Sequence, residues 1–290
     1  MRILITGASG LLGGRLCVLL SPDHETTGLI RSQPAPQGIT AFSADLAEEA
    51  APLAALEQAR PDAVIHCAAL ADAEVCEREP ARARRDNLTV TEQLAAACRS
   101  RGARLITIST DLVFDGGHAF SDEASPAHSL TEYGRSKLAA ETATLQASSD
   151  SVVLRVALVG GRGHGRRLTA TESVARRLQE GEAVTLYEDE WRTPVDPESV
   201  AEAIRAVLRL PSASGCFHIA GAERVSRVEL GERVARAFGL DASLIRRAPQ
   251  SSHRGAPRPA DVSLDIARAR EELGWRPRPL DTALREGRLD

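Results

Sequence analysis

The sequence predicts an α/β fold, a doubly wound parallel sheet followed by a smaller C-terminal lobe. Residues 2–6 form an apolar, β-branched run that leads straight into a glycine-rich turn and a helical pattern. Five or six such strand-plus-helix units alternate up to about residue 160, which favours a parallel sheet with right-handed crossovers. Beyond Gly160 the rhythm loosens into proline-rich connections and further helical patterns, and these predict a separate lobe.

The composition limits the classes of protein that this chain can be. A chain of 290 residues with 43% hydrophobic and 26% charged residues has the ordinary make-up of a soluble globular protein with a large core. The net charge of −4 and the pI of about 6.0 provide no overall attraction for nucleic acid or an anionic membrane, so neither partner is expected. No apolar run approaches the roughly 18 residues of a membrane helix. A core strand that starts at residue 2 leaves no room for a signal peptide, and we therefore expect a cytoplasmic protein.

The cysteines predict neither a disulfide framework nor a zinc site. Their number is odd, no two have CxxC spacing, and most lie in apolar surroundings, as reduced structural thiols do in a cytosolic protein. No group of histidine, cysteine and carboxylate residues has the spacing of metal ligands, so no metal is expected. The five cysteines are Cys17, Cys67, Cys76, Cys98 and Cys216.

The glycine-rich turn predicts a site for a pyrophosphate group. Gly7, Gly10 and Gly13 follow the first strand at three-residue spacing and open a helix whose apolar positions begin at Leu11. Glycines allow a tight turn and a close approach of the backbone, and the free N–H groups and dipole of the helix start attract an anion. A glycine-rich turn that binds nothing is the alternative, but its place in the first strand–turn–helix unit favours a nucleotide.

The residues after the second strand indicate which dinucleotide binds. That strand is expected at residues 26–30, and Arg31 and Ser32 follow it about twenty residues beyond the turn. At this place an acidic residue accepts a hydrogen bond from a free ribose 2′-OH, whereas an arginine pairs with a 2′-phosphate. Arg31, with Ser32 as a second donor, therefore favours NADPH over NADH. An ordinary surface arginine, with NADH as the cofactor, is the alternative.

The next two strands place further residues at the same edge of the sheet. Asp45 and Leu46 lie between a strand and a helix. Asp45 could cap that helix or accept a hydrogen bond from an adenine amino group, with Leu46 over the ring, and the sequence leaves both roles open. The strand at 63–67 ends in small residues that leave space for a ligand, and its His66 is expected to be a hydrogen-bonded core residue.

The remaining elements continue the alternation of strands and helices up to about residue 160 and then depart from this pattern. We expect residues 1–160 to form a dinucleotide-binding domain, with 195–220 packing back onto it, and 161–194 and 221–290 to form a smaller substrate-binding lobe. The other expected strands are 39–43, 104–109, 151–156, 184–186 and 216–219, and the other expected helices are about 47–59, 79–101, 130 onward, 167–180 and 197–210.

Tyr133 and Lys137 are the candidate catalytic pair. They lie four residues apart in a predicted helix, so both side chains project from one face. A free phenol has a pKa of about 10, and an ammonium group one turn away stabilises the phenolate and makes the tyrosine a usable general acid or base. Thr110, at a strand end where ligands gather, could hydrogen-bond the same substrate oxygen. A solvated helix face is the alternative, and the nucleotide turn upstream favours catalysis.

These motifs together resemble the extended short-chain dehydrogenase/reductase superfamily. The resemblance is carried by residues 6–13 (TGASGLLG), 109–111 (STD) and 133–137 (YGRSK). Within the superfamily, residues 108–116 (ISTDLVFDG) look like the dTDP-4-dehydrorhamnose reductase branch, and Arg258-Pro259 followed by VSLD is similar to its C-terminal signature. The resemblance covers essentially the whole chain and implies a Rossmann fold.

The resemblance implies a role for each residue of the catalytic triad. Thr110, Tyr133 and Lys137 match the triad of the family. Tyr133 would protonate a ketone oxygen as hydride arrives from the nicotinamide. Lys137 would also hold the nicotinamide ribose, and Thr110 would orient the carbonyl group.

The resemblance also implies where the cofactor and the substrate lie. Val156 to Leu158 would flank the nicotinamide, where the branch usually carries aromatic or hydroxyl residues. Residues 190–194 read EWRTP, whereas the branch usually has Asp-Gln-x-Gly-x-Pro-Thr, and this departure leaves the sugar open. Arginine forks suit phosphate oxygens, so Arg192 and Arg258 could hold a diphosphate. The candidate cofactor residues are Gly7, Ser9, Gly10, Leu11, Leu12, Gly13, Arg31, Ser32, Asp45, Leu46, Ala68, Ala69, Leu70, Tyr133 and Lys137, and the candidate substrate residues are Asp111, Trp191, Arg192 and Arg258.

Three functions are compatible with these residues. An NADPH-dependent reductase of a 4-keto nucleotide sugar is the leading one, with hydride added to the carbonyl carbon and the proton taken from Tyr133. A sugar-nucleotide epimerase is the second, whereas a dehydratase is disfavoured because Leu112 stands where a glutamate would follow Asp111. The third is a non-catalytic regulatory subunit similar to the β subunit of methionine adenosyltransferase, a family that shares the turn and the VFDG loop. The sequence permits a homodimer without requiring one.

Overall fold

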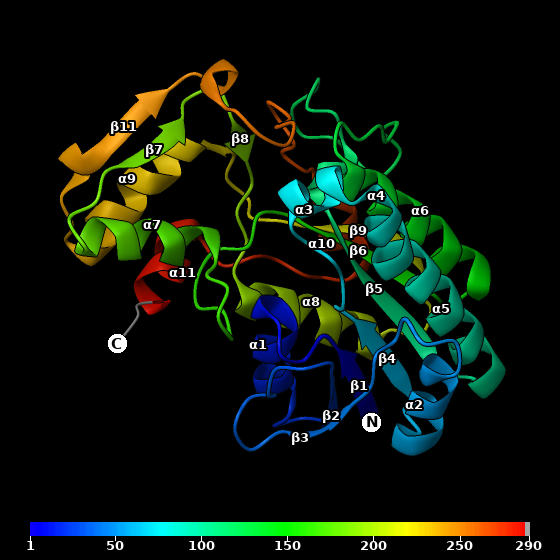
Figure 1. Ribbon diagram of the computed structural model, residues 1–290. Helices are drawn as coiled ribbons and strands as arrows, with labels where there is room; N and C mark the ends of the chain where they lie inside the picture. Colours follow the sequence, from blue (N-terminus) through cyan, green and yellow to red (C-terminus); the bar gives the residue numbers. More distant parts are fainter. Residues whose placement is uncertain (288–290) are drawn as a thin grey trace.

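A sheet of seven parallel strands forms the centre of the molecule (Figure 1). In the computed structural model, which describes residues 1–287, the strands are ordered β3-β2-β1-β4-β5-β6-β9 and every neighbouring pair is parallel. The chain winds outward from β1 in one direction and from β4 in the other, so the predicted doubly wound Rossmann fold is confirmed. The strands are β1 (Arg2–Thr6), β2 (Glu25–Ile30), β3 (Thr40–Ser43), β4 (Ala63–His66), β5 (Arg104–Thr110), β6 (Val152–Val156) and β9 (Gly215–Ile219).

Apolar layers cover both faces of this sheet because side chains alternate along its strands. In β1, Ile3 and Ile5 belong to one core layer and Leu4 to the other. Both layers are apolar, as expected for parallel strands that are buried on both faces. Helices α1 (Leu11–Leu20) and α8 (Pro197–Arg209) pack on the first face, and α2 (Ala51–Ala59) and α5 (Val90–Arg101) on the second, with α6 (Glu132–Ala147) beside α5 (Figure 1).

The helix that the sequence predicts over residues 79–101 is present as continuous helical backbone over residues 80–101, with a π-helical turn inside it. Glu79 precedes a proline, a position that disfavours helical backbone, and it separates two short helices. A π-helical turn then leads into α5. The helical segment before β5 consists of α3 (Ala73–Arg78), α4 (Pro80–Ala83), the π-helical turn (Arg84–Thr89) and α5.

A second, smaller core lies beside the central sheet and belongs to the later part of the chain (Figure 1). Strands β7 and β11 pair in parallel, and three helices pack with them. Leu178, Leu186, Val234 and Leu284 lie in one apolar cluster that joins these elements. The elements are α7 (Ala170–Gln179), β7 (Val184–Tyr187), α9 (Arg227–Phe238), β11 (Ile245–Ala248) and α11 (Leu280–Glu286).

One segment expected in the smaller lobe packs against the central sheet instead. The sequence assigns residues 221–290 to that lobe, but Val262 and Trp275 are buried in the core of the central sheet. Helix α10 (Ala267–Glu272) packs against β9, and the indole N–H of Trp275 donates a hydrogen bond to the carbonyl of Ser199 at 2.9 Å. Burial of these apolar side chains places this segment with the central sheet rather than with the smaller lobe. The last three residues of the assigned range lie outside the described part of the chain.

Short elements connect the two cores. Strand β8 (Trp191–Arg192) pairs with β10 (Val225–Ser226) in the antiparallel sense. Single 3-10 turns lie at Asp111–Val113, Ala242–Leu244 and Gln250–Ser252. Across residues 1–287, no helix has both the length and the apolar content needed to cross a membrane.

Candidate active site

The glycine-rich turn brings backbone groups, rather than side chains, to the end of β1. Gly7 has a φ of +68°, which favours glycine, and a side chain there would meet the backbone N of Ala68 at 2.8 Å. The N–H of Gly10 donates to the Gly7 carbonyl at 2.8 Å, and α1 starts next without a side-chain cap. A Cβ on Gly13 would run into the same carbonyl. The start of α1 is therefore open on the side where an anion would bind.

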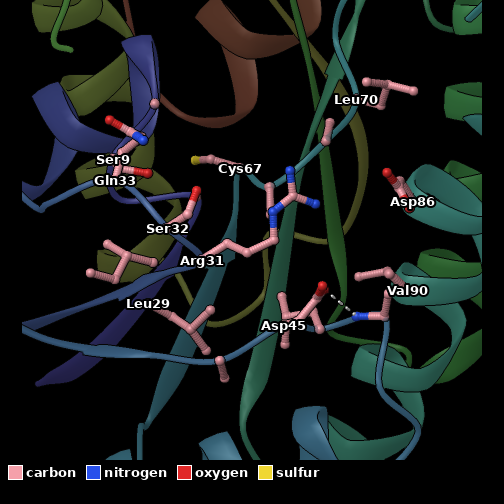
Figure 2. A pocket seen from close by; sticks show the side chains of 18 residues that line it. Ser9, Leu29, Arg31, Ser32, Gln33, Asp45, Cys67, Leu70, Asp86 and Val90 are labelled. Atoms are coloured by element: carbon pink, nitrogen blue, oxygen red, sulfur yellow. Dashed lines mark hydrogen bonds between the residues drawn. The ribbon is translucent and has the colours of Figure 1, made fainter. Parts of the chain in front are cut away.

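A pocket of about 280 Å³ lies against this turn, at the carboxyl ends of the strands (Figure 2). The predicted residues Leu11, Leu12 and Gly13 lie in the first turn of α1, behind the lining of the pocket. The predicted cofactor residues that line the pocket are Gly7, Ser9, Gly10, Arg31, Ser32, Asp45, Leu46, Ala68, Ala69 and Leu70. The lining residues that the sequence does not single out are Leu29, Ile30, Gln33, Ala44, Ala47, Cys67, Asp86 and Val90.

Arg31 supplies the positive charge of this pocket at the end of β2. Its side chain is exposed and extends across the pocket, with Ser32 next to it (Figure 2). The carbonyl of Arg31 accepts a hydrogen bond from Ser43 Oγ at 2.9 Å, which ties the loop after β2 to the end of β3. The guanidinium group is therefore held at the pocket by the ends of two neighbouring strands.

Asp45 forms a local turn and does not cap the following helix. Its Oδ1 accepts a hydrogen bond from the N–H of Ala47 at 3.0 Å (Figure 2). Helix α2 begins only at Ala51, so one of the two roles that the sequence leaves open is wrong. Leu46 is 5% exposed and lines the pocket next to Asp45, as a residue that covers a base would.

Thr110 and Tyr133 come together at the carboxyl edge of the sheet. Strand β5 ends at Thr110, whose hydroxyl donates to Asp111 Oδ1 at 3.1 Å and accepts from the N–H of Leu112 at 3.2 Å. Tyr133 lies in the first turn of α6, near enough to Thr110 for that hydroxyl to lower the pKa of its phenol. Lys137 follows one turn later and is 2% exposed. Two of the three predicted catalytic residues thus lie close together, and the third is on the same helix as Tyr133.

Burial controls the pKa values of the tyrosine and the lysine. It raises the pKa of the Tyr133 phenol, and the charge of Asp111 raises it further, while the hydroxyl of Thr110 acts in the opposite direction. The expected lowering of the Tyr133 pKa by Lys137 is therefore not observed, because the cost of a buried phenolate dominates. Burial lowers the pKa of Lys137 to about 8, against the opposing charge of Glu141. Tyr133 is thus a protonated phenol at neutral pH, the form that can donate a proton.

A buried asparagine, to which the sequence assigns no role, connects the cofactor pocket to the catalytic helix. Asn87 lies in the π-helical turn, a feature that often marks functional sites, and is 1% exposed. Its Oδ1 accepts from the N–H of Leu70 at 2.7 Å, and its Nδ2 donates to the Leu70 carbonyl at 3.1 Å and to Ser136 Oγ at 2.8 Å. Ser136 Oγ donates in turn to the carbonyl of Tyr133 at 2.7 Å. Asn87 therefore fixes one wall of the pocket against α6.

His66 is the hydrogen-bonded core histidine that its apolar surroundings predict. Thr91 donates its hydroxyl proton to the Asn87 carbonyl at 2.7 Å, so it accepts from Nε2 of His66 at 3.0 Å. Thr6 Oγ1 accepts from the N–H of Ala68 at 3.1 Å and donates to Nδ1 of His66 at 2.7 Å. Burial and the charge of Lys137 lower the pKa of His66 to about 3, so it is neutral. The histidine serves to hold the end of β4 in place.

A second pocket, of about 230 Å³, lies next to the catalytic residues. Asp111 and Thr131, the neighbours of the catalytic strand end and of the start of α6, line one side of it. Arg192 and Arg258 line another side, so three of the four predicted substrate residues share this pocket. Burial raises the pKa of Asp111, against the charge of Arg192. Its lining therefore combines two buried acids, Asp111 and Glu190, with arginines from a distant part of the chain.

Trp191, the fourth predicted substrate residue, does not line this pocket. The guanidinium group of Arg224 lies 3.9 Å from the centre of the indole ring, a cation–π contact. Arg224 also pairs with Asp261 at 2.6 Å. The ring is thus engaged in the contact between β8 and the segment that returns to the central sheet.

A glutamate without an assigned role in the sequence organises the arginines of the second pocket. Glu190 is 1% exposed, and its carboxylate accepts from Arg258 at 2.7 and 2.9 Å. Arg192 lies 3.1 Å from the same carboxylate and Arg227 lies 3.8 Å from it. Burial alone would raise the pKa of Glu190, but the hydrogen bonds and charges of the arginines lower it below its usual range. Both predicted phosphate-binding arginines are therefore paired with an internal carboxylate.

Comparison with known proteins identifies the family. A family model described as the RmlD substrate binding domain matches residues 1–287. The chain belongs to this family. Membership confirms the resemblance to the extended short-chain dehydrogenase/reductase superfamily and to its dTDP-4-dehydrorhamnose reductase-like branch. Within residues 1–287, no group of three or more potential ligand side chains could hold a metal ion.

Relatives of two kinds cover nearly the whole chain. The probable low-salt glycan biosynthesis reductase Agl14 of Haloferax volcanii is 33% identical over 279 residues, which are 94% of this chain and 93% of that protein. The methionine adenosyltransferase 2 subunit beta of Xenopus laevis is 30% identical over an alignment of 294 positions, which covers 98% of this chain and 86% of that protein. The first agrees with the oxidoreductase class that the sequence predicts, and the second with the regulatory alternative.

Solved structures of a reductase and of an epimerase share the fold. A hypothetical dTDP-4-dehydrorhamnose reductase from Sulfolobus tokodaii superposes with a TM-score of 0.84 at 33% identity, covering 95% of this chain and 96% of that one. The UDP-glucose 4-epimerase of Thermus thermophilus, solved with NAD, superposes with a TM-score of 0.83 at 27% identity, covering 99% and 97%.

Proposed function

We propose that this chain is an NADPH-dependent reductase of a 4-keto nucleotide sugar, with Tyr133 as the proton donor. The observation that carries the proposal is the position of Thr110 and Tyr133 relative to the two pockets. Asn87 and Ser136 connect the Tyr133 carbonyl to Leu70 of the pocket at the glycine turn, and Asp111, next to Thr110, lines the pocket with the arginines. The reductase among the relatives supports the same class of reaction.

The first pocket fits a nicotinamide dinucleotide. Side chains on Gly7 and Gly13 would collide with the backbone of the turn, so the turn keeps open a cradle of backbone groups. Helix α1 starts there without a side-chain cap, and its N–H groups and dipole suit a diphosphate. A nicotinamide bound along this wall would supply hydride for the carbonyl carbon.

Arg31 and Ser32 support NADPH as the reductant. They line the pocket at the end of β2, where a ribose 2′-phosphate would lie, and that position carries no acidic residue to accept from a ribose 2′-OH. The guanidinium fork suits the oxygens of a phosphate group. Asp45 and Leu46 would then contact the adenine ring.

The catalytic residues act on the oxygen of the substrate carbonyl. Thr110 orients this oxygen through its hydroxyl, and Tyr133, protonated because of its burial, donates its phenolic proton as negative charge develops there. Lys137 is mainly in its charged form at neutral pH and stabilises the tyrosinate that remains. The diphosphate of the substrate would lie in the second pocket, against Arg192 and Arg258.

A regulatory role is the second candidate function. It is favoured by the relatives named as subunit beta of methionine adenosyltransferase 2, which align with 98% of this chain. In this role the chain would bind a nucleotide and a catalytic partner without turning over a sugar. The assembled triad favours the reductase.

A turnover assay separates the two functions. The purified chain is incubated with NADPH and a panel of 4-keto nucleotide sugars, and loss of NADPH absorbance is followed together with the alcohol product. Substrate-dependent oxidation with stoichiometric alcohol supports the reductase. Oxidation no faster than with heat-denatured protein, together with tight binding of a methionine adenosyltransferase catalytic subunit, would replace it with the regulatory role.

A further inference from the structure

Three arginines cluster around one buried glutamate, Glu190, at the second pocket. Arg192, Arg227 and Arg258 surround Glu190 at 2.7 to 3.8 Å, so the cluster keeps an excess of two positive charges. Glu190 is ionised, because the arginines lower its pKa despite its burial. Charges inside such a pocket are screened less than charges on the surface, so the excess positive charge attracts an anionic ligand that enters.

The other charged residues around the pocket change this excess little. Asp72 and Arg167 form a pair at 3.5 Å at the rim, and both are exposed. Glu74, half exposed at the same rim, accepts a hydrogen bond from the N–H of Ala256 at 2.8 Å. Asp111 is a second buried carboxyl group of the lining, and its burial raises its pKa against the charge of Arg192. The positive charge at the inner pocket comes from Arg192 and Arg258, which line it, and from Arg227, which contacts Glu190 without lining the pocket.

Two buried atoms beside the cluster have no hydrogen-bond partner. They are Nη1 of Arg227 and Oδ2 of Asp111, and Asp111 is 4% exposed and lines the pocket. Buried polar atoms without partners are rare and costly in folded proteins. One donor and one acceptor beside an excess of positive charge are what a polar anion with hydroxyl groups would use.

We propose that Glu190 is a built-in counterion that matches this pocket to a ligand with two negative charges. The inference rests on the proposed function, because such a ligand is a nucleoside-diphosphate sugar, whose two phosphates each carry one charge. A free nucleoside diphosphate has a terminal phosphate with a second pKa of about 6 and carries an additional charge above that pH. Glu190 weakens the attraction for that additional charge, so the free nucleotide gains less over the intact nucleotide sugar than it would from the three arginines alone. Glu190 is thus a specificity-determining residue that acts through the arginines.

The test compares two ligands that differ in this one charge. Dissociation constants for dTDP and dTDP-glucose are measured by calorimetry at pH 8, in the presence of NADP⁺, for the wild-type chain and for Glu190→Gln. The variant gains one positive charge, so the ratio of the two constants should move about tenfold in favour of dTDP. Glu188→Gln removes the same charge from an exposed side chain two positions away and should leave the ratio unchanged.

Two further variants separate charge from structure. Arg227→Gln lowers the excess charge and leaves Glu190 with two arginines, so the ratio should move in the opposite direction. The double variant E190Q/R227Q restores the original charge and should return the ratio to within about twofold of the wild-type value. Should E190Q fail to fold because its arginines lose their counterion, R227Q and the double variant still carry the test.

Each remaining outcome contradicts the inference in a different way. If the folded variants weaken both ligands equally and keep the wild-type ratio, Glu190 only holds the arginines in place and the counterion role is wrong. If the wild-type chain binds NADP⁺ but neither dTDP-glucose nor UDP-glucose, the nucleotide-sugar assignment fails, and the inference fails with it.

Discussion

The two pockets of this chain are built in opposite ways. The first is lined by residues within the range 7–90, mostly from the turns that follow β1, β2, β3 and β4, and Arg31 is its only cationic lining residue in that range. The second draws its lining from segments as far apart as Asp72 and Pro259 and contains a buried ion cluster. The first pocket therefore depends on local backbone geometry, and the second on charges that meet only after the chain has folded.

Tyr133 is the proposed proton donor, and its replacement should have the largest effect. We expect Tyr133→Phe to lower kcat about a thousandfold, because the proton donor is lost. Binding of NADPH in one pocket and of nucleotide sugar in the other should stay within about twofold, since the ring remains. Steady-state kinetics and equilibrium binding measure the two effects.

Tyr187→Phe is the matched control, because it removes the only other tyrosine hydroxyl and should leave kcat unchanged. Turnover by Tyr133→Phe at the wild-type rate would show that another group donates the proton.

Arg258 tests the second pocket alone. Arg258→Gln removes two hydrogen bonds to Glu190 and one charge beside the ligand, so we expect a rise of about thirtyfold in KM for the nucleotide sugar. The dissociation constant of NADPH should not change, because the first pocket does not contain this residue. Arg254→Gln, at an exposed arginine of the same segment, is the control. Equal losses for the sugar and for NADPH would indicate that the two pockets are not independent.

The difference between a pocket built from local turns and a pocket built from distant charges also explains which site residues could be predicted from the sequence. The glycine turn, Arg31 and the Tyr133–Lys137 spacing are local patterns, and the structure places them at one edge of the predicted sheet. Glu190 lies 68 positions from Arg258, and no local pattern records that these two residues pair.

Two further features of the site, the role of Asn87 and the pKa of Tyr133, also could not be predicted from the sequence. Asn87 lies 49 positions from its partner Ser136, so its role becomes visible only in the folded chain. The pKa of Tyr133 also escaped prediction, because burial outweighs the effect of spacing along one helix.

Arg31 tests the first pocket alone, with the smallest expected effect. Because its side chain is exposed, solvent weakens its interaction with a 2′-phosphate, and we expect Arg31→Ala to weaken NADPH binding only about tenfold. NADH lacks this phosphate, so its dissociation constant should stay within about twofold, and KM for the nucleotide sugar should not change. Arg31→Lys keeps the charge without the fork and should give an intermediate loss, smaller at high salt. Fluorescence titrations with both cofactors at two salt concentrations measure these effects. An equal loss for NADPH and NADH would place the 2′-phosphate away from Arg31 and leave the cofactor pocket without the charge that now distinguishes it.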